Sequence, residues 1–465
     1  MQRYEFPPEF QFGAATAAAQ IEGAGHEDGK TDSIWDAYCR TPGNIIDGSN
    51  IEVACDHYHR MEEDVALIKR LNLDMYRFSI SWARVRPDDR DFNALGIDFY
   101  SRLVDELLAN DITPWITLYH WDEPRALLEQ GGWANRDTAY RFAEYAARVY
   151  EELGDRVEYW TTLNEPWCSS FLSYAAGIHA PGYTDPKQAV AAAHHLLLGH
   201  GLAAKEIRSR ADGKPLSLGI TLNFTVAHPA DPNSAADHDA ARQIDGAHNR
   251  IFLDPLLRGS YPADVCDDMR EAGLDRVIRD GDLDIISQPL DVLGVNFYNG
   301  VAVAGPSGSE INSTTPYVGA ERIRTLSRGL PVTDMGWEVL ADDLRELLIR
   351  LDKEYTGPAG IPIFITENGA AYPDVCDETG FVDDTHTRLA YIRDHLIAVH
   401  EAIGQGVDIN GYFAWSLMDN FEWTFGYTKR FGIVRVDYET GARTPKASAH
   451  WYARTASRKG FDAPA

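Results

Sequence analysis

Eight runs of apolar, β-rich residues recur along the 465-residue chain, and segments with helical spacing separate most of them. Within each run the apolar residues are continuous rather than alternating, which is typical of strands buried on both faces of a parallel sheet. The runs occupy residues 10–18, 75–82, 114–121, 157–166, 216–225, 291–299, 362–369 and 409–417. Eight buried strands that alternate with helices predict the α/β class and, within it, a (β/α)8 TIM barrel.

The segments between the runs predict helices and long loops. Residues 62–72 and 138–154 have the clearest amphipathic spacing, and Gly154 is expected to end the second helix. Long loops over the C-terminal face of the strands are expected at about residues 30–60, 225–250 and 300–340. Because the chain has no sequence repeat and no Gly/Ser-rich linker, residues 1–465 are predicted to form a single catalytic domain.

Composition limits the partners and the location. The formal charge is −28, from 43 basic and 71 acidic residues, and such an acidic surface repels a phosphate backbone, so nucleic acid is not expected as a partner. With no run of 18 apolar residues and no signal peptide at the start, no membrane association is expected. The five cysteines are odd in number, scattered and without C-x-x-C spacing, which favours reduced thiols in a cytoplasmic protein.

Polar and aromatic residues gather at the ends of the predicted strands. In a barrel of this kind the active site lies at the C-terminal ends of the strands. The residues found there are Gln20, Arg77, His120, Trp121, Asn164, Glu165, Asn296, Tyr298, Glu367 and Trp415. Structural residues would not be expected to collect polar groups at one end of every strand, so this pattern predicts an active site on that face.

Two of these strand ends finish on a glutamate. The stretch "EYWTTLNEPW" places Glu165 directly after a buried strand, and "IPIFITENGA" does the same with Glu367. Cleavage of a glycosidic bond needs one carboxyl group that is protonated and a second that is ionised, so the surroundings must separate their two pKa values. Either glutamate alone could be a salt-bridged structural residue, but the pair in this setting favours catalysis.

Nearby residues can support such a pair. Arg77 and Tyr298 are candidates to keep Glu367 ionised, by charge and by hydrogen bonding. Asn164, beside Glu165, offers an amide that can bind a sugar hydroxyl.

Aromatic residues with polar neighbours predict a sugar-binding surface. Sugar rings stack their C–H faces on aromatic rings, and their hydroxyls need directional partners. In the stretch "WSLMDNFEWTFGYTKRFG", Glu422 can accept hydrogen bonds from two adjacent hydroxyls, and the Trp423 indole can donate to a third. Tryptophans at suspected site positions, which could also simply fill loop packing, are Trp121, Trp167, Trp337, Trp415 and Trp423. His57 and His59 lack a further ligand cluster at metal spacing, so no metal site is predicted.

The chain resembles the family 1 glycoside hydrolases, the β-glucosidase family. The resemblance rests on "QIEGA", "YRFSISWARV", "LYHWDEP", "TLNEPW", "GVNFY", "MGWEV", "ITENG" and "NFEWTFGY", which occur in this order between about Phe10 and Trp451. It implies a (β/α)8 barrel with Glu165 as general acid/base and Glu367 as nucleophile, and no cofactor or metal. The residues implied to bind the sugar are Gln20, His120, Trp121, Asn164, Asn296, Trp337, Trp415, Glu422 and Trp423, with Tyr298 contacting the nucleophile.

The implied activity is hydrolysis of neutral β-D-glucosides and short β-linked oligosaccharides with retention. The two carboxyl groups are then expected to lie about 5–5.5 Å apart. Glu422 would repel a 6-phosphate, so an unphosphorylated sugar is implied. Two residues depart from the family pattern: Ala19 replaces an aromatic residue and Glu123 replaces a leucine.

Three other functions stay open from the sequence. One is a β-galactosidase, a β-fucosidase or a broad β-glycosidase, since Glu422 and Gln20 suit either configuration at the 4-hydroxyl. Another is transglycosylation, in which a sugar replaces water as the acceptor. The third is a non-catalytic carbohydrate-binding barrel, which the intact glutamate pair disfavours.

Overall fold

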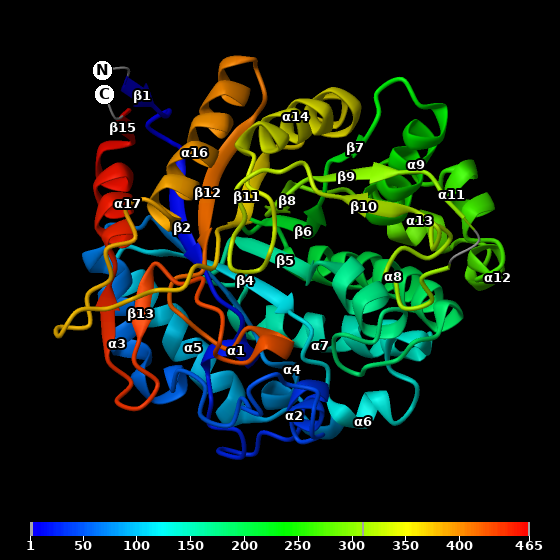
Figure 1. Cartoon of the computed structure of the whole chain (residues 1–465). Helices are drawn as coiled ribbons and strands as arrows, with labels where there is room; N and C mark the ends of the chain where they lie inside the picture. Colours follow the sequence, from blue (N-terminus) through cyan, green and yellow to red (C-terminus); the bar gives the residue numbers. More distant parts are fainter. Residues whose placement is uncertain (1–2, 309–310, 464–465) are drawn as a thin grey trace.

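The computed structural model describes residues 3–308 and 311–463. Eight parallel strands close into a barrel in chain order, which confirms the predicted fold (Figure 1). The strands are β2 (Gln11–Ala15), β3 (Met75–Ser79), β4 (Thr113–Tyr119), β5 (Tyr159–Asn164), β6 (Ser217–Phe224), β8 (Val292–Phe297), β11 (Ile363–Asn368) and β12 (Ile409–Trp415). Each lies on one of the eight predicted runs, with β4 starting one residue before its run.

Helices between successive strands cover the outside of the barrel (Figure 1). The longer ones are α3 (His57–Arg70), α5 (Ala94–Ala109), α7 (Asp137–Leu153), α8 (Pro186–Ala211), α10 (Ile251–Arg258), α14 (Ala341–Leu351), α16 (Arg388–Gly404) and, after the last strand, α17 (Ala447–Arg458). Short helices are α1 (Ala18–Ile21), α2 (Ile34–Cys39), α4 (Trp82–Val85), α6 (Arg125–Leu128), α11 (Ala263–Asp268), α12 (Leu274–Val277), α13 (Asp282–Ile286) and α15 (Gly357–Ala359).

Both helices expected from amphipathic spacing are present, as α3 and α7. Gly154 follows the last residue of α7, as predicted, although its φ of −71° is that of an ordinary helix. The reason for glycine is space, because a Cβ atom at this position would lie 2.6 Å from the carbonyl oxygen of Tyr150.

The expectation of long loops was wrong in part. β7 (Ala227–Pro229), β9 (Val301–Ala304) and β10 (Arg324–Leu326) form a separate three-stranded sheet, and α9 (Ala235–Asp245) continues into the π-helical turn η4 (Gly246–Arg250). In α9 only Ala240 and Ile244 are buried. Ile244 is the only large apolar residue of this helix, whose other apolar residues are alanines, so the segment was interpreted as a loop.

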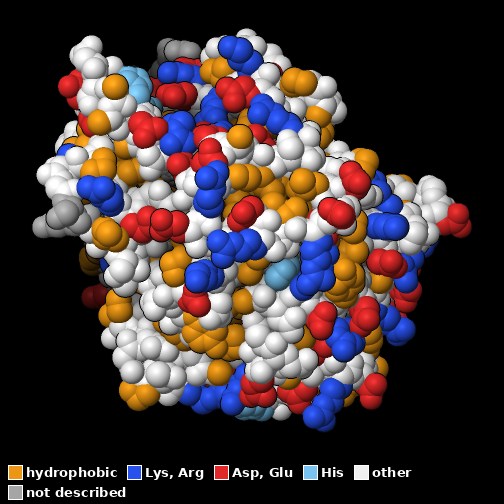
Figure 2. Space-filling view, turned by 90° about the vertical axis from the view of Figure 1, so that its right-hand side faces the viewer, with side chains coloured by type: hydrophobic (Ala, Val, Ile, Leu, Met, Phe, Trp, Pro, Cys, Tyr) orange, Lys and Arg blue, Asp and Glu red, His pale blue; other side chains and the backbone are white. Residues whose placement is uncertain are grey.

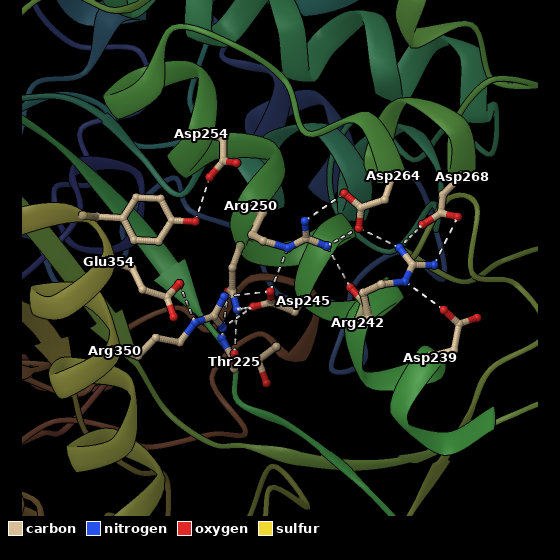
Figure 3. Close-up of polar contacts among 12 residues, drawn as sticks. Thr225, Asp239, Arg242, Asp245, Arg250, Asp254, Asp264, Asp268, Arg350 and Glu354 are labelled. Atoms are coloured by element: carbon tan, nitrogen blue, oxygen red, sulfur yellow. Dashed lines mark hydrogen bonds and ion pairs between the residues drawn. The ribbon is translucent and has the colours of Figure 1, made fainter. Parts of the chain in front are cut away.

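Ion pairs compensate for the small apolar face of this segment (Figure 3). Arg242 and Arg250 both contact Asp264 on α11, at 2.7 and 2.6 Å. Asp245 accepts a hydrogen bond from Arg250 at 2.9 Å and another, at 2.7 Å, from Arg350 on α14. The network ties α9 and η4 to the helices that surround the barrel.

Two short pairs of antiparallel strands lie outside the barrel. β1 (Arg3–Glu5) pairs with β15 (Gly460–Asp462), so the two ends of the chain lie side by side (Figure 1). β13 (Val434–Val436) pairs with β14 (Arg443–Pro445), and both strands lie between β12 and α17 in the chain.

The barrel interior is aromatic at one end and polar at the other. The Trp115 ring lies 5.0 Å from Phe364 and 5.5 Å from Phe413, and all three side chains are buried. Because side chains alternate along a strand, Thr366 lies on the same side as Phe364, one step nearer the C-terminal end. The aromatic layer therefore closes the barrel beneath the polar strand ends.

The face of the molecule shown in Figure 2 is not divided into regions of a single charge. On the face shown in Figure 2, acidic and basic side chains are interspersed with small hydrophobic areas. Among the described residues, no helix is long and apolar enough to cross a membrane.

Glu123, one of the two departures from the family pattern, is a fully buried carboxyl group. Neither of its oxygens has a hydrogen-bond partner within the described part of the chain. Burial raises the pKa of Glu123 to about 8, because ionisation without a compensating charge is disfavoured in an apolar setting. At neutral pH the side chain is therefore mainly protonated.

Glu123→Gln should remove a pH-dependent loss of stability. The pKa of Glu123 rises from 4.5 to about 8 on folding. Within that window the folded chain holds a proton that the unfolded chain has released, so wild-type stability falls as pH rises. Relative to the variant, the wild-type free energy of unfolding is expected to fall by about 1.4 kcal/mol per pH unit. Urea denaturation at several pH values between 5 and 8 measures this difference.

The matched control is Glu62→Gln, since Glu62 is exposed on α3. Its stability difference from the wild type should stay constant over the same pH range. A constant difference for Glu123→Gln as well would show that the buried carboxyl does not govern this pH dependence.

Candidate active site

A cavity of about 760 Å³ lies at the C-terminal ends of the barrel strands. The predicted site residues that line it are His120, Trp121, Glu165, Tyr298, Trp337, Glu367, Trp415, Glu422 and Trp423. Arg77, Asn164 and Asn296 are hydrogen-bonded directly to lining residues. Gln20 donates to Asn420 and Phe421, in the segment that carries Glu422. The structure thus brings all the predicted residues together.

Glu367 lies at the end of β11, where the strand register shifts. The shift falls between Ile365 and Glu367 in the pairing with β8, and it places Glu367 opposite Asn296. Such an irregularity re-aims a side chain that strict alternation would point away from the interior. Arg77 donates to Glu367 Oε1 and Tyr298 donates to Oε2, each at 2.7 Å.

Glu165 follows β5 in a strained backbone conformation. Its φ is +49°, a region that residues with a side chain rarely adopt and that persists where surrounding structure enforces it. Asn296 Nδ2 donates to Glu165 Oε1 at 2.7 Å, and the Cys168 thiol donates to Oε2 at 3.2 Å. The carboxyl group is therefore oriented by two neutral groups.

These different neighbours give the two carboxyl groups different pKa values. Burial, followed by the charge of Glu367, raises the pKa of Glu165 to about 8. Burial also raises the pKa of Glu367, but the Arg77 charge and the hydrogen bonds from Arg77 and Tyr298 oppose that rise. Glu367 is consequently the carboxyl that ionises first, and Glu165 is the one that keeps its proton.

Asn164 connects the groups around the pair. Its Oδ1 accepts from Arg77 Nη2 at 2.6 Å and from Asn296 Nδ2 at 3.1 Å. Its Nδ2, which can only donate, lies 3.1 Å from His120 Nε2. His120 is neutral because burial, aided by the charge of Arg77, lowers its pKa well below the usual value. The His120 proton is therefore assigned to Nδ1.

Among the residues predicted to bind the sugar, three buried polar atoms have no hydrogen-bond partner in the described part of the chain. They are Gln20 Oε1, His120 Nδ1 and Glu422 Oε2. Buried polar groups are normally paired, so these atoms are suited to a ligand with several hydroxyl groups. Burial raises the pKa of Glu422 to about 8, assisted by the charges of Glu367 and Glu165.

Stacked rings form one wall of the cavity. The rings of His120 and Trp415 lie nearly parallel, at 18° and 5.7 Å, and those of Trp121 and Trp423 lie 4.5 Å apart. Trp121 already donates its indole N–H to the carbonyl oxygen of Asn164 at 3.0 Å. Trp121 therefore offers a ligand its ring face.

The outer half of the cavity was mostly missed by sequence reasoning. Trp167, which was noted there, stacks on His248 with ring centroids 4.1 Å apart. His248 belongs to η4, inside a segment that had been interpreted as a loop. Apart from Asn223 and Phe224 at the end of β6, the other missed lining residues come from segments outside the barrel strands and include Cys168, Ile178, His179, Tyr317, Leu326 and Val332. A strand-end pattern does not mark such residues.

The arrangement defines a class of protein. One cavity holds a carboxyl that stays protonated, a carboxyl that ionises and unpaired groups suited to hydroxyls. This is what a glycosidase that works through two carboxyl groups requires.

The chain belongs to glycosyl hydrolase family 1, whose family model matches residues 2–461. A bifunctional β-D-glucosidase/β-D-fucosidase from Bifidobacterium breve is 47% identical over 97% of both chains. A thermostable β-glucosidase B from Thermobispora bispora is 48% identical, over 98% of this chain and 91% of the relative.

Solved structures agree in fold along the whole chain. A psychrophilic β-glucosidase from Micrococcus antarcticus is 54% identical, with a TM-score of 0.92 over 97% of this chain and 98% of the other. A Thermotoga maritima β-glucosidase in complex with deoxynojirimycin is 41% identical, with a TM-score of 0.92 over 99% and 100% of the two chains.

Tyr298→Phe should raise the pKa of Glu367, because the carboxylate loses one of its two donors at 2.7 Å. A hydrogen bond to a charged group contributes roughly 1.5–3 kcal/mol, so the acid limb of kcat/KM should move up by about one to two pH units. The pH profile on an aryl β-glucoside measures the shift. Tyr140→Phe, at an exposed position, is the control. An unmoved acid limb would contradict the role given to Tyr298.

Proposed function

We propose that the protein is a retaining β-glucosidase that releases terminal β-D-glucosyl residues from β-glucosides and short β-linked oligosaccharides. The observation that carries this proposal is the contrast between Glu165, held by two neutral donors, and Glu367, held by a buried guanidinium. The substrate is a small neutral glycoside.

In the first step the Glu367 carboxylate attacks the anomeric carbon. The bond from that carbon to the leaving oxygen breaks, and its electron pair stays on the oxygen. Glu165 gives its proton to that oxygen, which leaves as a neutral alcohol. This assignment follows the order of ionisation, since the raised pKa of Glu165 keeps a proton available at neutral pH.

In the second step Glu165, now ionised, takes a proton from water. The resulting hydroxide oxygen bonds to the anomeric carbon from the face that the aglycone has left. The ester bond to Glu367 breaks, and its carboxylate returns to the contact with Arg77 and Tyr298. Two inversions at the same carbon give net retention.

The glycone is proposed to occupy the inner half of the cavity. Gln20 Oε1 and Glu422 Oε2 accept hydrogen bonds from its hydroxyls, and His120 Nδ1 donates to one, since these atoms lack partners among the described residues. The ring stacks on Trp415, with Asn164, Asn296, Trp121, Trp337 and Trp423 completing its surroundings.

The aglycone is proposed to lie in the outer half. Trp167 Nε1 and His248 Nδ1 are buried and lack partners among the described residues, and both side chains line the cavity. A second sugar ring could stack there and bond to both. This supports activity on short oligosaccharides such as those released from cellulose.

We also propose that the chain acts as one catalytic domain. Support comes from the strands that close the barrel, which span the chain from β2 to β12, and from the pairing of β1 with β15. The five cysteines, none in a disulfide, support a cytoplasmic location.

A second activity, hydrolysis of β-D-fucosides, is favoured by a specific observation. One relative, 47% identical over nearly its whole length, is named a bifunctional β-D-glucosidase/β-D-fucosidase. Fucose has the galacto configuration at its 4-hydroxyl, which Gln20 and Glu422 can also bind. Transfer to a sugar acceptor would use the same two carboxyl groups.

Azide should separate the roles of the two carboxyl groups. Glu367→Gly should lose at least about 10⁴-fold in kcat and, with azide, yield the α-glucosyl azide, because azide takes the place of the nucleophile. Glu165→Ala with azide should instead yield the β-glucosyl azide from an activated aryl glucoside. Product anomers are read by NMR. The opposite pairing of products would exchange the two assignments.

A panel of p-nitrophenyl glycosides tests the glycone. The β-glucoside and β-fucoside should be hydrolysed, with the β-galactoside slower. The β-glucoside 6-phosphate should be at least about 10²-fold poorer in kcat/KM, because the described residues that line the cavity include four glutamates but no lysine or arginine to pair with its charge. Preferred hydrolysis of the phosphate ester would refute the use of Glu422. No turnover of any member would reopen the binding-protein hypothesis.

A further inference from the structure

Cys168 is the second group in contact with the Glu165 carboxyl. Its Sγ lies 3.2 Å from Glu165 Oε2, and the side chain lines the cavity although the residue is only 5% exposed. Sequence reasoning treated this cysteine only as one of five reduced thiols. The geometry gives it a closer relation to the chemistry.

Backbone hydrogen bonds hold the thiol beside Glu165. The N–H of Cys168 donates to the carbonyl oxygen of Glu165 at 2.9 Å, and Cys168 opens the π-helical turn η3 (Cys168–Leu172). Single π-turns often occur at functional sites. Ser170 donates to the Pro166 carbonyl at 2.6 Å, and Ser173 donates to that of Cys168 at 3.0 Å. These bonds hold the turn beside Glu165.

The two contacts of Glu165 differ in what they permit. The Asn296 amide nitrogen can only donate, and the carbonyl oxygen of a protonated carboxyl accepts better than its hydroxyl oxygen, so this bond favours Glu165 Oε1 as the unprotonated oxygen. The exchangeable proton of Glu165 is therefore favoured on Oε2, next to Cys168. A thiol can donate weakly to an ionised oxygen and accept weakly from a protonated one.

We propose that Cys168 is a positioning residue for the acid/base carboxyl, holding Glu165 Oε2 in line with the cavity in both its protonated and its ionised state. The inference rests on the proposed function. Burial raises the pKa of the thiol well above its usual value, so it stays neutral and the site gains no further negative charge.

Other titratable groups also influence the pKa of Glu165. Variants that test Cys168 must therefore leave these groups unchanged. They are Glu367 on β11, Arg77 on β3, Tyr298 after β8 and Glu422 in the segment after β12. Only the donor at Oε2 should change.

Two substitutions should move the alkaline limb of the kcat/KM profile in opposite directions. Cys168→Ala removes the donor, so the ionised form of Glu165 is less favoured and the limb should rise by about half a pH unit. Cys168→Ser supplies a stronger donor, so the limb should fall by a similar amount. The acid limb, which Glu367 governs, should stay in place in both variants.

The matched control is Cys55→Ala. The Cys55 thiol is also buried and donates at 3.2 Å, but to the backbone carbonyl of Asp419. Its loss should leave the alkaline limb where it is. Opposite shifts of the alkaline limb in the two Cys168 variants would support the proposal. A changed rate with both limbs of the pH profile unmoved would show that Cys168 only packs against its neighbours, and would overturn the proposal.

An infrared measurement on the unaltered protein gives a second test, independent of whether the variants fold. The S–H stretching band of a thiol that faces Glu165 should shift as pH passes through the alkaline limb, and Glu165→Gln should abolish the shift. An S–H stretching band that does not shift with pH would also overturn the proposal. If the wild type itself hydrolyses no β-glycoside, the proposed function fails, which is a result distinct from either of these.

Discussion

Arg77 and Glu367 reach each other across the barrel from β3 and β11, and their ion pair is almost fully buried, with the two residues 1% and 2% exposed. At this depth an unpaired charge would be strongly disfavoured, so each group depends on the other. Arg77 also binds Asn164, which in turn orients His120. Much of the inner site is thus built outward from this one pair.

The same ion pair contributes to the difference in pKa between the two carboxyl groups. Glu165 is also buried but is hydrogen-bonded to an amide and a thiol rather than to a cation. Burial, and then the charge of ionised Glu367 nearby, raise the pKa of Glu165. The Arg77 guanidinium, together with the Tyr298 hydroxyl, therefore favours ionisation of Glu367 over Glu165, and the roles proposed for the two glutamates depend on this difference.

The predictable part of the molecule is the part governed by local patterns. Strands buried on both faces must be apolar throughout, so all eight barrel strands were visible, as were the polar residues at their ends. The segments with β7, α9 and η4 were not, since they contain few large apolar residues and are held by ion pairs such as Arg350 with Asp245. Consequently His248 and its stack on Trp167 could not be anticipated.

By itself the sequence determined the barrel, and it determined which chemical groups stand at the strand ends, because both follow from periods of a few residues. Only the tertiary structure decided what those groups become. Arg77 and Glu367 are 290 positions apart in the chain, and the Glu165 carboxyl owes its retained proton to burial and to that distant pair. Electrostatic character depends on distance in space and on exclusion of water, which folding alone establishes.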